Sequence, residues 1–480
     1  MSRINTNVPS IVAARILEKN NTMLNQSLTR LSTGLRINSG KDDPAGLIAS
    51  ENLRSELTAI KAAMDNANRA DQIVAVTEGS LQEINTLLIE LEDLVDRAAN
   101  TAGLSSEEVA ANQLQIDTVL DSINRIANSS EFNGKKLLNG ELDYTTSGVT
   151  TGSTGSSVTH LQINSARIPE GGSRSVTIQM TQSALTAQLV RSGAATGSGV
   201  TTLQIGGKYG TELLSFASAT AASAVVAAVN QSKALTGVSA ALSGAGSTAA
   251  IKFNSVDYGS DAFVSVEAVS GTFTVTGGSS STKDYGQDAG VQINGTSAVT
   301  KGLDVSLRTA ALSVDMTLSS DFATQLTNTK SFTITGGGAN FSIAPTVGIN
   351  GMASIGIKSV NTGSLGKGDV GYLSSLASGA ANDLSSQNFT TAQRIIREAS
   401  KNVSSLRGRL GSFQKNTLAP IVSSLQVAFE NTTAAQSAIR DADFAQETSN
   451  LTRAQILVQA GTASLQLANR SPQNVLALLG

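Results

Sequence analysis

Residues Pro44–Asn100 read PAGLIASENLRSELTAIKAAMDNANRADQIVAVTEGSLQEINTLLIELEDLVDRAAN. Apolar residues recur every seven positions in this stretch without a break, and they are Leu53, Ile60, Ala67, Val74, Leu81, Leu88 and Val95. A seven-residue apolar repeat is typical of a helix that packs lengthwise on another helix. Asp43 can cap the start of this helix, and Pro44 fits its first turn. The stretch predicts one long helix whose apolar stripe another part of the chain must cover.

Shorter helices are expected on both sides of this stretch. Before it, a leucine seam predicts a helix that ends near Ser39, and the seam residues are Leu17, Leu24, Leu28, Leu31 and Leu35. After it, a helix is expected from about Ser105 to Asn128. Ser105 is a suitable cap, and Glu107 and Glu108 are favourable in the first turn.

The last hundred residues repeat this pattern. One apolar series, with steps of three and four, runs from Ile396 to Phe413, and a second runs from Leu418 to Ala442. The step from Phe413 to Leu418 changes the phase, which predicts a local stagger. A final helix is expected from about Thr448 to Asn469. Because the stripes at the two ends can bury each other, they predict an antiparallel coiled-coil bundle built from both termini.

The middle of the chain is rich in Gly, Ser and Thr and reads as β structure. Apolar and polar residues alternate over Leu303–Leu307 and Leu312–Leu318, while Asn294-Gly295 is a hairpin-turn signal. Thr220–Asn230 reads as a short helix within this region. The predicted fold class is α+β multidomain, with a β-rich central insertion at the far end of the helical bundle, where insertions are best tolerated.

Composition excludes several classes of function. The net charge is −3, which gives no electrostatic case for nucleic acid or an anionic membrane as a partner. The chain has no Cys, so neither disulfides nor thiolate metal sites are possible. His160 is the only histidine, and we interpret it as an exposed surface residue. No secretory signal or membrane span is apparent, so export would need a route without a cleaved signal.

Long runs at both ends resemble bacterial flagellin, in the right order along the chain. At the N-terminal end they include RLSTGLRINSGKDDPAGLIAS (Arg30–Ser50), TEGSLQEIN (Thr77–Asn85) and EFNGKKLLNG (Glu131–Gly140). At the C-terminal end they are RDADFAQETSNLTRAQIL (Arg440–Leu457) and SPQNVLALLG (Ser471–Gly480). The resemblance covers about the first 190 and the last 130 residues. Leu203–Asn230 and Val291–Val299 are similar, less closely, to insertion modules of some flagellins.

This resemblance implies an architecture and a set of partners. Residues 1–44 and 443–480 would form an inner coiled coil that lines a channel. Residues 45–190 and 350–442 would form a rod-like helical shell with β-hairpins, and residues 191–349 a surface-exposed β-rich variable region. The protein would be a non-enzymatic, extracellular subunit of a helical homopolymer for swimming, without cofactors. It would be exported unfolded by the flagellar type III apparatus. Its partners would be itself, an export chaperone, the filament cap and the hook–filament junction proteins.

The resemblance also assigns site residues. Intersubunit coiled-coil contacts are expected from the leucine seam and from a C-terminal set, Leu451, Ile456, Leu457, Leu465, Leu476 and Leu479. The run Ile89-Glu90-Leu91-Glu92-Asp93-Leu94-Val95-Asp96 aligns with the segment that animal Toll-like receptors bind in this family. It keeps the leucine of the recognised pattern as Leu94, but Glu90 replaces an arginine. Because Glu accepts and Arg donates hydrogen bonds, weak or no receptor recognition is expected.

Other functions remain open from the sequence. A hook–filament junction protein shares the terminal resemblance, although the long insertion and the match at Ser471–Gly480 favour the filament subunit. An enzyme displayed on the same scaffold is a second alternative, but a metalloprotease needs two histidines and no spacing singles out another catalytic set. A surface adhesin acting through residues 190–350 is a third.

Overall fold

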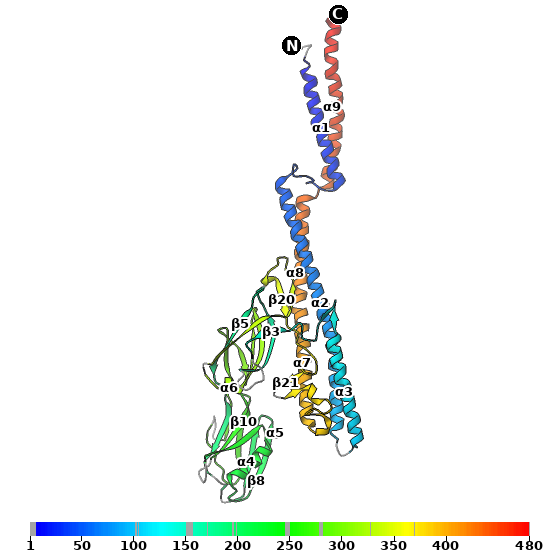
Figure 1. The fold of residues 1–480 in the computed structure, drawn as a ribbon. Helices are drawn as coiled ribbons and strands as arrows, with labels where there is room; N and C mark the ends of the chain where they lie inside the picture. The colour runs from blue at the N-terminus through cyan, green and yellow to red at the C-terminus, as the bar shows by residue number, and fades with distance from the viewer. Residues whose placement is uncertain are drawn as a thin grey trace. The chain divides into compact units, whose positions relative to one another are not determined.

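The computed structural model describes residues 6–100, 103, 105–149, 157–169, 171–193, 196–197, 199–244, 250–277, 282–326, 328–368 and 370–479, the last of these without side chains after residue 470 (Figure 1). The chain divides into two compact units. The first comprises Met1–Arg69, Ser342–Val347 and Leu418–Gly480, and the second comprises Ala70–Phe341 and Gly348–Thr417.

Helices from the two ends of the chain pair within the first unit. Helix α1 (Val8–Thr33) lies antiparallel to α9 (Phe444–Leu479), as Figure 1 shows in blue and red. The first turns of α2 (Pro44–Ala98) contact α8 (Ala419–Arg440), where Ile60 and Ala63 pack with Leu425. The expected pairing of the two termini is therefore confirmed.

The turn between α1 and α2 differs in part from expectation. Helix α1 ends at Thr33 rather than near Ser39, because Gly34 adopts a left-handed conformation with φ 72° and closes the helix. The chain beyond it pairs with the α8–α9 connection, where the Arg36 N–H donates to the Arg440 carbonyl at 2.7 Å. Asp43 caps α2 as predicted, since its carboxylate accepts from the Gly46 N–H at 2.9 Å.

The main helical core lies in the second unit. There α2, from Ala70 onward, packs with α3 (Ser106–Ser129) and α7 (Phe389–Phe413) around buried residues such as Leu81, Leu88 and Ile395. Helix α3 starts with a capping box between Ser105 and Glu108, close to the predicted boundary. Two short 3₁₀ helices, η3 (Leu373–Leu376) and η4 (Leu384–Ser386), cover its first turns.

Asp117 ties α3 to the segment between these 3₁₀ helices. Its carboxylate accepts from the Ser378 N–H at 2.9 Å, the Ser378 hydroxyl at 2.6 Å and the Gln113 amide at 3.0 Å. Burial by itself raises the pKa of Asp117, but these hydrogen bonds outweigh it, so the pKa lies below its ordinary value.

A single π-helical turn separates α7 from α8. This turn, η5 (Gln414–Leu418), contains the five-residue step from Phe413 to Leu418 that shifts the apolar series. A π turn takes up one additional residue, so the apolar face resumes in a new phase. The predicted stagger is confirmed, and Gln414 in this turn donates to the Asp71 carboxylate at 3.1 Å.

Two β domains belong to the second unit, and we name them by their topology. The host β domain has two antiparallel sheets, with strand orders β14-β13-β5-β18-β3 and β15-β16-β17-β4. Its strands are β3 (Tyr144–Ser147), β4 (Val158–Ala166), β5 (Arg174–Gln182), β13 (Gly290–Ile293), β14 (Thr296–Ser297), β15 (Val299–Lys301), β16 (Asp304–Arg308), β17 (Leu312–Leu318) and β18 (Thr329–Gly337), with the short helix α6 (Ser320–Ala323). Alternate residues of these strands form a common core that includes Val176, Ile178 and Val314.

The inserted β domain, Thr186–Tyr285, interrupts the host between β5 and β13. Its sheets have the orders β6-β10-β9 and β12-β11-β7-β8. Its elements are β6 (Thr186–Arg191), β7 (Thr201–Gly207), β8 (Gly210–Phe216), α4 (Ala222–Gln231), α5 (Lys233–Thr236), β9 (Val238–Ser243), β10 (Ala250–Tyr258), β11 (Phe263–Ser270) and β12 (Lys283–Tyr285). Helix α4 confirms the predicted short helix, and its Val225 and Val229 are buried with Phe253.

The β-rich middle is confirmed, and with it the α+β fold class. Strands β16 and β17 match the two alternating stretches, and Asn294-Gly295 forms the turn between β13 and β14, with φ values of 50° and 78°. The remaining short elements are β1 (Glu131–Phe132), β2 (Lys135–Lys136), β19 (Ala339–Ser342), η2 (Ile349–Gly351), β20 (Met352–Ile355), β21 (Gly366–Lys367) and β22 (Gly371–Tyr372). Strands β4, β5 and β6 belong to the central sheets, although most of their residues lie before residue 191, in the range expected for the helical shell.

Adjacent residues of α2 allow a direct test of the helical core. Leu88 is 1% exposed and Ile89 is 60% exposed. We expect Leu88→Ala to destabilise the monomer by about 2–5 kcal/mol, because it leaves a cavity in the core. Ile89→Ala should change stability by less than about 0.5 kcal/mol. Urea unfolding of the helical circular dichroism signal measures both; equal effects would contradict the packing of α2.

Asp117 gives a pH-dependent prediction. Its folded-state pKa is depressed, so its stabilising contribution is present above the unfolded pKa and is lost as pH falls through the folded pKa. Asp117→Asn should lower the urea midpoint at pH 7, and the difference from the parent should shrink at pH values below the ordinary value of 3.8. Asp121→Asn, at an exposed position one turn further along α3, is the control. A difference independent of pH would contradict the role of the carboxylate.

Candidate functional site

Polar side chains hold α1 and α9 in register. The Asn20 amide donates to the Leu457 carbonyl at 3.1 Å, and the Ser27 hydroxyl donates to the Glu447 carboxylate at 3.0 Å. Arg30 lies 3.6 Å from the same carboxylate. Asn20, Ser27 and Glu447 are all buried. Because a buried polar group must keep its partner, these contacts favour one register of the pair over others.

These polar residues lie at regular positions on the side of α1 that faces α9, which we call the α1 seam. Steps of three and four connect Leu17, Asn20, Leu24, Ser27 and Leu31, so a polar residue takes every second seam position. The leucines alone do not indicate Asn20 and Ser27, although the spacing of three and four residues does. Gly461 lies opposite Leu17, where an added Cβ would come within 3.4 Å of the leucine Cδ1.

The predicted contact residues fall into two groups in the monomer. The half-buried ones are Leu17, Leu24 and Leu31 of α1, Leu451 and Leu465 of α9, and Leu35, which lies beyond the end of α1 and forms a β-bridge with Asp441. Three others are exposed: Leu28 at 46%, Ile456 at 59% and Leu457 at 40%. The side chains of Leu476 and Leu479 lie outside the described residues, although α9 includes both positions.

More apolar side chains on the same two helices face away from their partner. They are Val8, Ile11, Val12, Ile16 and Met23 of α1, with Phe444 and Leu467 of α9. The helical core of the second unit, in contrast, buries leucines and isoleucines almost completely. A monomer that leaves so many large apolar side chains in water presents a surface suited to burial against other chains.

The acidic segment 89–96 presents mainly its polar side. Ile89 and Glu90 are exposed, whereas Leu91, Leu94 and Val95 are buried in the helical core. The carboxylates have partners: Glu92 accepts from Arg397 at 2.9 Å and Asp96 accepts from Gln393 at 2.9 Å. Asp93 forms an ion pair with Arg97 at 2.7 Å. The accessible face of this segment is therefore acidic, and Leu94 is only 5% exposed.

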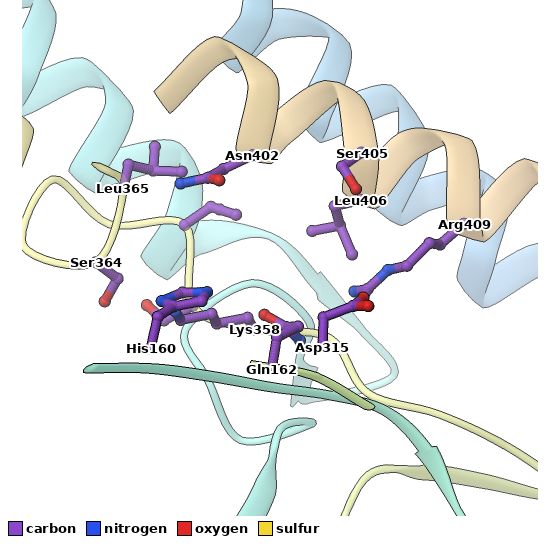
Figure 2. A pocket seen from close by; sticks show the side chains of 12 residues that line it. His160, Gln162, Asp315, Lys358, Ser364, Leu365, Asn402, Ser405, Leu406 and Arg409 are labelled. Carbon is purple, nitrogen blue, oxygen red and sulfur yellow. The ribbon is translucent and has the colours of Figure 1, made fainter. Parts of the chain in front are cut away.

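A small pocket lies between the host β domain and α7, and Figure 2 shows its lining. Its volume is about 160 Å³. His160 and Gln162 of β4 line it from one side, and Asn402 and Arg409 of α7 from the other. His160 is half-buried here, so its interpretation as an exposed surface residue was wrong. The strand that contains His160, β4, pairs with β17, which is distant in sequence. Local sequence patterns therefore could not predict this environment of His160.

Charged side chains of both signs surround this pocket. Asp315 accepts from Arg308 at 2.7 Å and from Asn164 at 2.8 Å. Burial lowers the pKa of Arg409 to about 10, and its guanidinium donates to the Gly356 carbonyl at 3.1 Å. Burial also raises the pKa of the Asp143 carboxyl and lowers the pKa of the Lys358 ammonium. The attraction between these two charges opposes both shifts. The hydrogen bond from Arg409 joins α7 to the segment that contains Gly356.

Two features of the described part of the chain concern metal binding and membranes: the grouping of its metal-ligating side chains and the apolar length of its helices. No group of three or more of its His, Asp or Glu side chains is placed to hold a metal ion. Within the described residues, no helix has an apolar stretch long enough to cross a bilayer. The terminal helix pair, with its exposed apolar side chains, is the candidate functional surface.

Comparison with known proteins relates both ends of the chain to one family. Residues 4–143 match the model of the bacterial flagellin N-terminal helical region, and residues 393–479 match that of the C-terminal helical region. The flagellin of Salmonella typhimurium is 29% identical over 99% of both chains. Flagellin E of Vibrio cholerae is 44% identical over 138 residues, which are 29% of this chain and 36% of that one.

A solved structure of FliC from Burkholderia pseudomallei is 16% identical, covers 72% of this chain and 98% of its own, and has a TM-score of 0.24. That likeness is too weak to add to the sequence relationships. The two end-specific models, found in the right order, and the relatives that span the full length agree with the paired terminal helices and the β-rich middle. This chain belongs to the bacterial flagellin family, the structural subunits of the extracellular filament that drives swimming.

Proposed function

We propose that this flagellin polymerises through the exposed apolar side chains of α1 and α9. The observation that carries the proposal is the division of the terminal leucines. Leu17, Leu24 and Leu31 are engaged within the monomer, while Leu28 and Ile456 remain 46% and 59% exposed. Because the α1 seam already has its partner, the exposed set is free to contact neighbouring subunits.

The energy of such contacts fits a reversible assembly reaction. Full burial of one large apolar side chain is worth about 1.5–3 kcal/mol. Leu28, Ile456 and Leu457 together with the other exposed residues of the pair could therefore offset the entropy lost when a subunit joins the polymer. The polar contacts of Asn20 and Ser27 fix the register of α1 and α9, so every subunit presents the same surface.

The family architecture then assigns layers to the chain. Residues 1–44 and 443–480 form the inner coiled coil around the channel, and residues 45–190 and 350–442 form the shell. Residues 191–349 form the variable surface. The pairing of α1 with α9 and the helical core around α2, α3 and α7 support this assignment. In the structure, the sheets of the middle region also include β4 and β5, so the surface layer would recruit residues before 191.

The same features fit export as an unfolded chain through the flagellar type III apparatus. The terminal helices bury few side chains in the monomer, so keeping them unfolded before assembly costs little. We assign an export chaperone to the C-terminal end, which would cover Ile456, Leu457 and their neighbours. The filament cap would receive the chain at the growing tip, and hook–filament junction proteins would supply the first surface for assembly.

Recognition by Toll-like receptors should be weak. Glu90 is exposed at the position where the recognised pattern has arginine, and the matching leucine, Leu94, is buried in the monomer. A receptor surface that accepts an arginine would face a carboxylate here, which adds repulsion and removes a hydrogen-bond donor.

The first test compares two leucines of equal exposure. Leu28 of α1 is 46% exposed and Leu242 of β9 is 45% exposed. Filament fragments serve as seeds, and electron microscopy measures elongation by purified monomer. We expect Leu28→Ser to raise the critical concentration by about tenfold or more, because burial of this leucine between subunits is worth at least about 1.4 kcal/mol.

Leu242→Ser should elongate seeds like the parent protein, and both variants should keep the circular dichroism of the parent monomer. Equal elongation by the two variants would contradict the assignment of Leu28 to a subunit contact. Failure of the parent protein itself to elongate seeds would contradict the homopolymer.

A second test concerns the receptor. Purified monomer of the parent protein should give a weak response in Toll-like receptor reporter cells, and Glu90→Arg should increase it by about tenfold, in line with a restored charge-assisted contact. Glu83→Arg, an exposed position outside the segment, is the matched control for added positive charge. A strong response to the parent protein, or equal responses to the two variants, would exclude the proposed role of Glu90.

A further inference from the structure

The chain passes between the host β domain and the inserted β domain twice, at two adjacent positions. The chain enters through Leu185 and returns through Gln287, and these two residues form an antiparallel bridge. The Leu185 N–H donates to the Gln287 carbonyl at 3.0 Å, and the Gln287 N–H donates back at 2.9 Å. If these two connections were the only contacts, they would act as a hinge, and the inserted domain could rotate about it.

A third contact lies beside these crossings and comes from the β10–β11 loop of the inserted domain. In this loop, the Ser260 N–H donates to Asp288 Oδ1 at 3.0 Å, and the Ser260 hydroxyl donates to Oδ2 at 2.6 Å. On the host side, the Gly302 N–H of the β15–β16 turn donates to the same Oδ1 at 2.6 Å. One carboxylate thus accepts from both domains, and hydrogen bonds to a charged group are stronger than neutral ones.

The backbones around Asp288 are packed too closely for side chains. Gly259 has φ 101°, and a Cβ there would lie 2.5 Å from the Cα of Gly302 and 2.5 Å from Asp288 Oδ1. Gly302 itself has φ 62°, and a Cβ would lie 2.8 Å from the Tyr258 carbonyl oxygen. Glycine is required at both positions because only it combines this backbone conformation with this approach.

Further contacts surround this joint. Tyr258, the last residue of β10, packs partly buried against the core of the host domain. The Gly286 N–H donates to the Ala262 carbonyl at 2.8 Å, and the Gly259 N–H to the Leu185 carbonyl at 3.3 Å. At the rim, Lys301 of the host lies 2.7 Å from Asp261 of the insertion, although both side chains are exposed. Contacts from three chain segments therefore oppose rotation about the crossings.

We propose that Asp288 locks the inserted β domain to the host β domain, so that the two move as one rigid body. Without the carboxylate, the Ser260 loop and the Gly302 turn lose their common acceptor, and the two crossings act as a hinge. The lock is independent of polymerisation, because none of its residues belongs to the terminal helices.

Distance measurements by pulsed electron paramagnetic resonance test the lock in the full-length monomer. The chain has no cysteine, so spin labels attach only where cysteines are introduced. Ala234→Cys in α5 and Ser331→Cys in β18, both at exposed positions, place one label in each domain. Ala234→Cys with Ser270→Cys places both labels in the inserted domain and reports on its integrity.

We expect a narrow distance distribution for the pair that spans the joint. Asp288→Ala should widen it by about twofold or more, and Asp288→Asn should have a smaller effect, since an amide oxygen still accepts one of these hydrogen bonds. Asp257→Ala is the matched control, because that carboxylate accepts hydrogen bonds from Lys208 and Tyr209, both of which belong to the inserted domain. It should leave the distribution unchanged.

The pair within the inserted domain separates loosening from unfolding, and it should stay narrow in every variant. Gly259→Ala is a second variant that leaves the carboxylate intact but forces the two backbones apart, and it should shift or widen the distribution across the joint. A distribution as wide in the parent as in Asp288→Ala would overturn the proposal. So would equal widening by Asp288→Ala and Asp257→Ala.

Discussion

The apolar stripe of α2 constrains the rest of this flagellin. A helix of 55 residues with one apolar side is unstable in water unless another surface covers that side along its length. The chain supplies this cover from its other end: α8 lies on the first turns of α2, and α7 with α3 covers the stripe from Val74 to Ala98. The two ends must therefore run antiparallel, and the remaining residues must leave and re-enter the bundle on the same side. The central β domains follow from that requirement as an insertion.

The terminal helices α1 and α9 also cover each other, but part of their apolar surface stays exposed. Two of the five α1 positions that face α9, Asn20 and Ser27, are polar, and their hydrogen bonds fix the register of the pair. The leucines and isoleucines that remain outside this seam have no partner of comparable size in the terminal pair itself. Under the proposed assembly, neighbouring subunits that bury these side chains would also stabilise the terminal helices.

Much of this architecture could be predicted from local patterns. The heptads of α2, the cap at Asp43, the shifted phase at Leu418 and the alternation in β16 and β17 all depend on residues close in sequence. The seam of α1 was only half predicted, because Asn20 and Ser27 look like surface residues until α9 covers them. The pocket beside His160 could not be predicted at all, since it depends on long-range pairing between β4 and β17.

The bridge between Leu185 and Gln287 has a consequence for how such a chain can vary. Paired residues on neighbouring strands lie only about 5 Å apart. The ends of the inserted domain therefore meet at the same spacing as the ends of an ordinary hairpin loop. The inserted domain has its own core and its ends meet at this spacing, which is the condition under which a domain insertion is tolerated. Exchange, loss or gain of this module would therefore leave the host β domain and the paired terminal helices unchanged.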